Sequence, residues 1–191
     1  MWSLSTVARV RLVPANPEDV DTDGLLLRRF VPDDTAALLS AFADDDIARW
    51  NPGPASAGDV ATWIDTRNDW TSGRHASWAV RDQDDRLLGA VSLHRIDDDQ
   101  LDAEVGYWVA PWARRQQVGV RALTAATRYA FRRLGLHRVY LFHAVDNAAS
   151  CRLASRAGFR HEGVLQQSYR YADGRYHDEH LHAMLATELP Q

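Results

Sequence analysis

One segment of the chain, residues 104 to 159, constrains the fold more than any other. It reads in order as strand, loop, helix, strand and helix. Apolar residues at spacings of three and four predict the central, amphipathic helix, namely Val120, Leu123, Thr127, Ala130 and Leu134. Gly135 follows as a helix stop. A helix between two strands favours an α/β domain in which the helix covers a sheet.

The remaining elements, read from the same kinds of pattern, extend this domain over most of the chain. Strands are predicted over residues 25–30, 77–81, 86–96, 103–109, 138–145, 159–171 and 175–188. Further helices are predicted over 32–42, 56–73 and, with Asn147 as its cap, 147–158. We therefore expect a single α/β domain with a central mixed β-sheet of about seven strands flanked by about four helices.

The N-terminal region and one acidic tripeptide fall outside this pattern. Residues 1–21 are interpreted as an N-terminal extension to a domain that spans residues 22–191. The mixed run from Val7 to Val13 is compatible with one more strand, which Pro14 would end. The run from Asp44 to Asp46 is predicted to form a solvated turn.

Composition excludes several classes of function. All 22 positively charged side chains are arginine and lysine is absent, which excludes Schiff-base lysines, Walker-type lysines and Ser-Lys nucleophile pairs. With a net charge of −4, the chain has no excess of positive charge that would attract nucleic acid or an anionic membrane surface. No uncharged stretch approaches the ~18 residues that span a bilayer. The lone Cys151 cannot form an internal disulfide, so we expect a cytoplasmic protein.

The start of the central helix is a candidate anion site. A helix that follows a strand directly presents unpaired backbone N–H groups and the positive end of its dipole. Here the start reads Arg114-Arg115-Gln116-Gln117-Val118-Gly119, with Arg121 close behind. Amides and arginine side chains together suit a diphosphate. The alternative is an exposed basic helix start that needs no ligand.

Segments spread over residues 22 to 189 resemble one protein family. They are Thr22 to Arg28 (TDGLLLR), Leu88 to Leu93 (LGAVSL), Glu104 to Pro111 (EVGYWVAP), the Arg114 to Gly119 loop, Leu134 to Val139 (LGLHRV) and Asp146 to Phe159 (DNAASCRLASRAGF). Their order makes the chain similar to the GNAT superfamily of acyl-CoA N-acyltransferases. Within it, the chain resembles the branch of RimJ and RimL, the ribosomal-protein N-terminal acetyltransferases.

The resemblance implies a splayed sheet and acetyl-CoA as co-substrate. A strand ending at Val109 would pair with pantetheine through its backbone, and the amides at the helix start would hold the pyrophosphate. The residues implied in cofactor binding are Val109, Arg114, Arg115, Gln116, Gln117, Val118, Gly119, Val120 and Asn147. Gln117 departs from the family pattern, which has glycine there. Because a positive φ costs a residue with a side chain about 1 kcal/mol, we expect weakened CoA binding.

Three side chains are candidates for catalysing acyl transfer to an amine. Glu104, on the strand that leads to the thioester, is the first candidate general base, with a cross-strand ion pair as the alternative. His143 is the second, with a packed histidine as the alternative. Where RimL-like enzymes can place a glutamate, this chain has Tyr169 and Arg170, so that base is not carried over. The resemblance implies that Ser150 hydrogen-bonds or protonates the departing thiolate.

The acceptor site and the histidine-rich tail are read from local composition. Trp50-Asn51-Pro52, interpreted as a non-helical turn, is predicted to line the acceptor pocket, where an aromatic wall can bind an amine by cation–π contact. Strand alternation in the tail puts His180 and His182 on one face with Asp178. Because neither a cysteine nor a second ligand cluster accompanies them, we expect no metal.

The leading functional prediction is an acetyl-CoA-dependent N-acetyltransferase. Its acceptor would be a protein N-terminal α-amine or a small-molecule primary amine that attacks the thioester directly. The alternatives are acetylation of an antibiotic or polyamine, transfer of a succinyl group, and a non-catalytic CoA-binding module marked by the altered loop. The expected partners are acyl-CoA and an amine, without nucleic acid or membrane, and a homodimer is compatible with the family.

Overall fold

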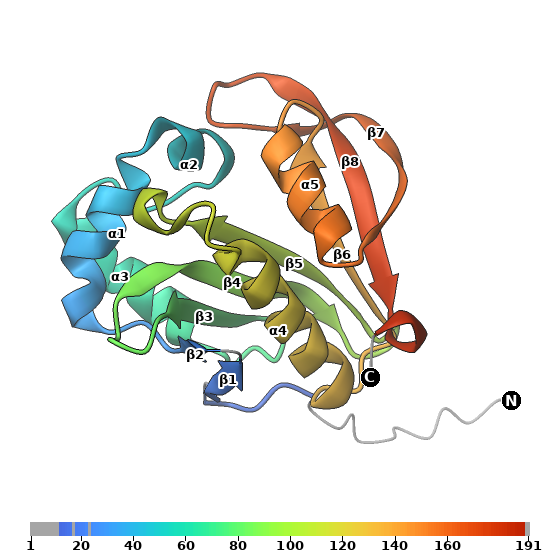
Figure 1. Cartoon of the computed structure of the whole chain (residues 1–191), viewed down its shortest axis with the longest axis horizontal. Coiled ribbons are helices and arrows are strands. Elements are labelled where there is room, and N and C mark those ends of the chain that lie inside the picture. The colour runs from blue at the N-terminus through green and yellow to red at the C-terminus, as the bar shows by residue number, and fades with distance from the viewer. Residues whose placement is uncertain (1–11, 17, 23, 190–191) are drawn as a thin grey trace, which may run out of the picture.

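The computed structural model describes residues 12–16, 18–22 and 24–189 (Figure 1). The strands are β1 (Val20–Thr22), β2 (Leu25–Arg28), β3 (Ala76–Arg81), β4 (Leu87–Asp97), β5 (Asp102–Val109), β6 (Arg138–Ala144), β7 (Arg160–Arg170) and β8 (Tyr176–Leu185). The helices are α1 (Thr35–Phe42), α2 (Asp45–Trp50), α3 (Ala57–Asn68), α4 (Val118–Arg132) and α5 (Ala148–Arg156). Single 3-10 turns lie at Pro32–Asp34, Pro111–Ala113 and Ala186–Glu188.

The strands form one mixed, eight-stranded sheet in the order β1-β2-β3-β4-β5-β6-β8-β7. Neighbours are antiparallel except for β5 and β6, which are parallel. The predicted α/β domain with a central mixed sheet is confirmed. The number of elements differs, because β1 adds a strand within the segment interpreted as an extension and α2 adds a helix.

The strand predicted between Val7 and Val13 falls mostly outside the described residues. Of that run, residues 7–11 are not among those described. Val13 is described, belongs to no strand and is fully buried. Nearby, Glu18 ties this region to the end of α4, because its carboxylate accepts hydrogen bonds from Tyr129 at 2.9 Å and from Arg133 at 2.8 Å.

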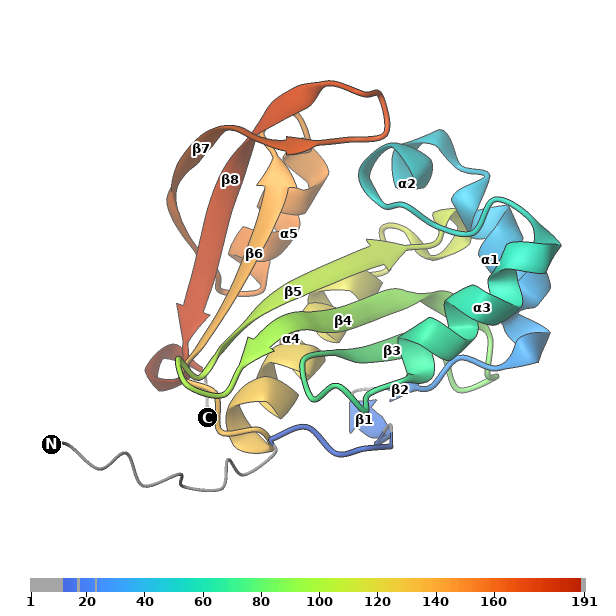
Figure 2. The same ribbon diagram turned by 180° about the vertical axis from the view of Figure 1, so that it is seen from behind.

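The sheet divides between β5 and β6. The two strands pair only where Asp102, Ala103 and Glu104 lie opposite residues 138–140. Beyond Glu104 they diverge, and Figures 1 and 2 show the two halves of the sheet splayed apart from this point. Within the described residues, positions 105–109 of β5 have no strand partner on the β6 side. The predicted splayed sheet is confirmed.

Helices cover both faces of the larger half of the sheet. α4 lies across β4 and β5 on one face, and α3 lies against β3 on the other (Figures 1 and 2). The inward face of α4 is the predicted one, since Leu123, Thr127 and Ala130 are fully buried. On the smaller half, α5 lies on the same side as α4 (Figure 1). Among the described residues, no helix is long and apolar enough to cross a membrane.

The turn predicted at Asp44 to Asp46 is wrong, because these residues begin helix α2. The Asp44 side chain caps the helix by accepting the amide of Ile47 at 3.1 Å. Asp45 and Asp46 occupy the first turn, where negative charge interacts favourably with the helix dipole. Trp50 is consequently the last residue of a helix, and the non-helical segment begins after it, at Asn51.

The helix predicted to run to Gly73 ends earlier, at Asn68. The Asn68 side chain bonds to the backbone of Phe30. Its oxygen accepts from the Phe30 amide at 3.0 Å and its nitrogen donates to the Phe30 carbonyl at 2.9 Å. Asp69, which follows, has an extended backbone. The polar side chain of Asn68 therefore ends α3 and joins it to the segment after β2.

A buried ion pair fastens the start of α1 to the sheet. The Arg81 guanidinium, at the end of β3, donates to the Asp34 carboxylate, and neither side chain is more than 4% exposed. Arg81 also donates to the backbone carbonyl of Asp85 at 2.6 Å. Because a buried charge without its partner costs several kcal/mol, each of the two residues requires the other.

We expect Asp34→Asn to lower the free energy of unfolding by about 2 kcal/mol, because it removes the buried countercharge of Arg81 and leaves only the exposed Asp85 carboxylate, 3.7 Å from Nε of Arg81. Urea denaturation followed by circular dichroism measures the change. The control is Asp33→Asn, which removes the neighbouring exposed carboxylate and should change stability by less than about 0.5 kcal/mol. Equal stabilities of the two variants would show that the ion pair does not hold α1 to the sheet.

Candidate active site

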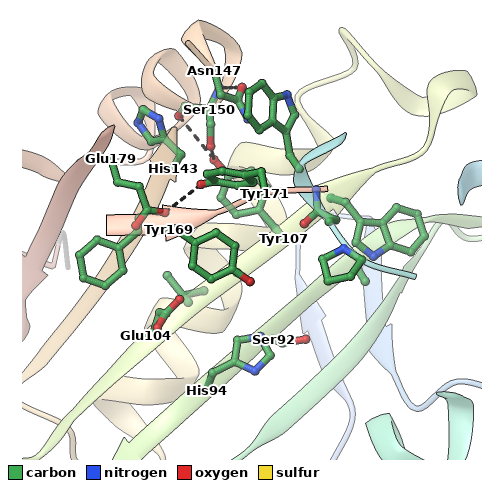
Figure 3. Close-up of a pocket in the computed structure, with 18 of the residues that line it drawn as sticks. Ser92, His94, Glu104, Tyr107, His143, Asn147, Ser150, Tyr169, Tyr171 and Glu179 are labelled. Carbon is green, nitrogen blue, oxygen red and sulfur yellow. Dashed lines mark hydrogen bonds between the residues drawn. The ribbon is translucent and has the colours of Figure 1, made fainter. Parts of the chain in front are cut away.

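A cavity of about 590 Å³ opens where β5 and β6 diverge. Its floor comes from β4 and β5, its far wall from β6, β7 and β8, and its rim from the ends of α2 and α3 (Figure 3). The fold brings seven of the predicted site residues to this cavity, namely Trp50, Asn51, Pro52, Glu104, His143, Asn147 and Ser150. These side chains come from both halves of the splayed sheet.

Glu104 lies on the floor of the cavity beside His94, its cross-strand neighbour on β4. Its Oε2 atom is 3.4 Å from Nη1 of Arg95, whose side chain is 72% exposed. Burial raises the pKa of Glu104, and the positive charge of Arg95 opposes this effect. Glu104 therefore faces the cavity, as expected of a base, and also makes the cross-strand ion pair weighed as the alternative.

His94 belongs to a buried hydrogen-bond network that the sequence did not reveal. Its Nδ1 lies 3.2 Å from Nδ1 of His75, and the Ser77 hydroxyl lies 2.7 Å from Nε2 of His75 and 2.6 Å from the Ser92 hydroxyl. Burial lowers the pKa of His94 to about 3 and that of His75 to about 4. Both rings are therefore neutral near pH 7. His75 lines a second surface hollow, so the network links that hollow to the cavity floor.

Tyr107 and Ser150 meet across the gap between β5 and α5. Their hydroxyl oxygens are 2.7 Å apart (Figure 3). The Ser150 amide donates to the Asn147 side chain at 3.0 Å, which confirms Asn147 as the cap of α5. Burial raises the pKa of Tyr107 to about 12, so its hydroxyl is protonated at neutral pH. Because one of the two hydroxyls donates to the other, the pair leaves one hydroxyl proton free to donate at the cavity.

The far side of the cavity is an aromatic wall formed by Trp50, Tyr169 and Tyr171. Tyr171 packs edge-on against Trp50 and against Tyr169, with ring centroids 5.1 and 4.9 Å apart respectively. Behind it, the buried carboxylate of Glu179 accepts hydrogen bonds from the hydroxyls of Tyr171 and Ser168, both at 2.8 Å. The wall therefore combines π faces with a fixed negative charge.

The loop before α4 contains two residues with a left-handed backbone, and the helix start lies near the end of β5, since a Cβ at Gly119 would lie 3.1 Å from Cγ2 of Val109. Arg115 and Gln117 have φ values of 63° and 59°. Left-handed residues in such a turn form a concave nest of N–H groups that suits an anion. Gln117 thus adopts the positive φ expected where the family has glycine. At Gly119 a Cβ would lie 2.4 Å from Cδ1 of Leu153, so glycine permits the close approach of α4 and α5.

Two of the predicted site residues, Arg114 and His143, bond to other groups of the protein. Nη2 of Arg114 lies 2.5 Å from the Asp44 carboxylate, so its side chain joins the α4 loop to α2. His143, on the cavity wall, donates through Nδ1 to the backbone carbonyl of Ala144 at 2.8 Å. Burial lowers its pKa. Nδ1 of His143 is therefore used within the protein, as in the packed histidine considered as the alternative, while the residue also lines the cavity.

Four residues of the cavity were not predicted from the sequence, namely His94, Tyr107, Tyr171 and Glu179. Strand alternation separates Tyr107 from Glu104, and only the position of α5 brings it to Ser150. Glu179 lies inside the histidine-rich tail, which drew attention to the histidines instead. Glutamate is scarce in this chain, and this scarcity was the sequence signal that pointed to Glu179.

Sequence comparison identifies relatives of the chain. The profile of the acetyltransferase (GNAT) domain matches residues 24–160. The N-acetyltransferase YoaA of Bacillus subtilis is 28% identical over 170 residues, which cover 87% of this chain and 96% of YoaA. The ribosomal-protein-serine acetyltransferase of Escherichia coli is 32% identical over 103 residues, which cover 54% of this chain and 57% of that protein.

Solved structures share the fold. RimJ of Mycobacterium smegmatis, in complex with CoA-disulfide, has a TM-score of 0.81 at 23% identity, covering 94% of this chain and 91% of RimJ. Spermidine N-acetyltransferase of Vibrio cholerae, in complex with CoA and spermine, has a TM-score of 0.75 at 23% identity, covering 87% and 98%. With the domain match across residues 24–160, the chain belongs to the GNAT family of N-acetyltransferases.

Proposed function

We propose that the protein transfers an acetyl group from acetyl-CoA to a primary amine in the cavity at the β5–β6 divergence. One observation carries this assignment. The gap exposes an unpaired strand edge between a nest of amides before α4 and the Tyr107–Ser150 hydroxyl pair, with Glu104 on the floor. These features supply a place for a diphosphate, for an extended thioester arm and for an attacking amine.

Backbone groups of the protein would make most of the contacts with CoA. The amides of the α4 loop and of its first turn, from Arg115 to Val120, are those that would hold the pyrophosphate. The free edge of β5, ending at Val109, would pair with the pantetheine arm, and Asn147 lies at the cavity beside it. Bound acetyl-CoA supplies the acetyl group as a thioester.

The chain's own groups would then serve three chemical needs. Glu104 would accept the proton that the amine loses as its nitrogen bonds to the carbonyl carbon. A backbone N–H near Val109 would polarise the carbonyl oxygen. Tyr107 and Ser150 would donate a hydrogen bond or proton to the sulfur as the C–S bond breaks. The products are an N-acetyl amine and the free CoA thiol.

The acceptor side offers carboxylates and aromatic rings to an amine. Glu104 and Glu179 place two carboxylates at the cavity, which Arg67 and Arg95 also line, and the aromatic wall borders it. A protein N-terminal α-amine needs only modest help, because its pKa is about 8. The two carboxylates also support a polyamine as the second candidate acceptor. The relatives named above include a ribosomal-protein acetyltransferase and a spermidine acetyltransferase, which supports testing both classes.

An acceptor panel tests this assignment. We expect thiol release from acetyl-CoA with N-terminal peptides or with polyamines, and succinyl-CoA assayed in parallel tests the alternative acyl group. An aminoglycoside serves as the third acceptor class, and omission of the acceptor gives the background hydrolysis. CoA binding by calorimetry without turnover on any acceptor would reject the enzyme in favour of a CoA-binding module.

Glu104→Gln tests the general base. Because the free-amine fraction falls as pH drops below the amine pKa of about 8, we expect kcat/KM to fall by about 10²-fold near pH 7 and by less above about pH 9. Since burial raises the Glu104 pKa, the wild-type profile should show, besides the fall caused by protonation of the amine, a second acidic limb above the ordinary glutamate range, and the variant should lack this second limb. Glu162→Gln, outside the cavity, is the matched control. Superimposable profiles for wild type and Glu104→Gln would remove Glu104 as the base.

Gln117→Gly tests the nest before α4. Glycine relieves the left-handed backbone and removes a side chain near the proposed pyrophosphate site, so we expect CoA to bind up to about five-fold more tightly, the equivalent of about 1 kcal/mol. Isothermal titration calorimetry measures the change. Gln116→Gly, at a neighbour without a positive φ, should not tighten binding. An unchanged dissociation constant for Gln117→Gly would show that Gln117 does not weaken CoA binding.

A further inference from the structure

Behind the cavity, between α5 and the β6–β8 half of the sheet, lies a cluster of nitrogen and sulfur donors that acetyl transfer does not use. It consists of His143 on β6, Cys151 on α5, and His180 and His182 on β8. One ligand atom from each residue lies within 4.8 Å of those of the other three. We call these four residues the His-Cys cluster.

The fold, rather than the sequence, assembles this cluster. In the β6–β8 register His143 lies directly opposite His180, and His182, two residues further on, lies on the same face of β8. α5 then brings Cys151 over this face, with Sγ 3.9 Å from Nε2 of His182. The expectation of no metal rested on the lack of a cysteine or second ligand beside the tail. The structure supplies both, because Cys151 on α5 and His143 on β6 lie beside His180 and His182.

Several histidine nitrogens of the cluster are buried without a hydrogen-bond partner. Nδ1 of His143 donates to the Ala144 carbonyl at 2.8 Å, so Nε2 carries the lone pair. That Nε2 atom is buried with no hydrogen-bond partner, and the residue is only 4% exposed. Nδ1 of His180 is likewise buried and unpartnered. Burying such atoms without a partner costs free energy, whereas a ring fixed by a backbone carbonyl is the usual arrangement of a metal-ligating histidine.

The geometry points to a structural Zn²⁺ site held by His143, Cys151, His180 and His182. Zn²⁺ takes imidazole nitrogen and thiolate sulfur in tetrahedral sites with four protein ligands, at about 2.0–2.3 Å. Ligands at those distances are about 3.3–3.8 Å from one another, so the 4.8 Å limit of the cluster requires only small side-chain rotations. Binding would release the Cys151 thiol proton, because the thiolate is the ligand.

Such an ion would connect the first turn of α5 to the sheet. Cys151 directly follows Ser150, whose hydroxyl pairs with Tyr107 at 2.7 Å. His143 also lines the wall of the catalytic cavity. A metal bound by these side chains would therefore fix the position of Ser150 without contacting substrate. The His-Cys cluster is a positioning and stabilising site, and its occupancy does not depend on which amine is acetylated.

Cobalt substitution tests the site without any acyl substrate. Full-length protein without an added histidine tag is freed of metal by chelation and titrated with Co²⁺. We expect one equivalent to bind, with a near-ultraviolet thiolate-to-cobalt charge-transfer band and visible d–d bands of tetrahedral intensity. Added Zn²⁺ should displace the cobalt and raise the melting temperature.

Substitutions assign the signal to the cluster. Cys151→Ser should abolish the charge-transfer band, and His180→Asn should weaken Zn²⁺ binding at least ten-fold, whereas His137→Asn, at an exposed histidine, should leave both unchanged. A folded wild-type protein with no charge-transfer band would overturn the proposal, as would wild-type Zn²⁺ affinity in both cluster variants. If the variants fail to fold, the wild-type cobalt spectrum decides alone.

Discussion

The early end of pairing between β5 and β6 is the constraint on which the rest of this structure depends. Parallel strands that stayed in register would satisfy the backbone of β5 and close the sheet. Here pairing ends at Glu104 and Tyr140, so residues 105–109 have no strand partner on one side within the described parts of the chain. Unpaired backbone groups away from water are costly, and an extended ligand arm is a natural partner for them. The cavity and the catalytic candidates all lie along this opening.

Specific contacts fix the helices on each half of the sheet. On one side, α1 is held to the sheet by the buried pair of Arg81 and Asp34. On the other, α5 begins at the Asn147 cap and approaches α4 closely at Gly119. The proposed Zn²⁺ site would add a third connection, which joins α5 to β6 and β8. The acyl-transfer site and the His-Cys cluster thus share one helix, whose first turn carries Ser150 toward the cavity and Cys151 toward β8.

The predictable parts of the protein were those encoded in local periodicity and local motifs. The spacing of Leu123, Thr127 and Ala130 predicted α4, and the residues from Arg114 to Gly119 predicted a loop whose positive φ at Gln117 the structure bears out. Helix α2 was missed because three successive aspartates indicate a turn, although Asp44 caps a helix and its neighbours favour the helix N-terminus. The Tyr107–Ser150 pair and the His-Cys cluster depend on how α5 lies over the sheet, which no local pattern encodes.

The central claim is that acetyl-CoA occupies the gap between β5 and β6. Hydrogen–deuterium exchange of the full chain, with and without acetyl-CoA, tests it most directly because it reports on the backbone amides themselves. We expect slower exchange on binding in two segments, residues 105–109 of β5 and 115–120 at the start of α4. Protection confined to other segments, or none at saturating acetyl-CoA, would show that acetyl-CoA does not bind in this gap.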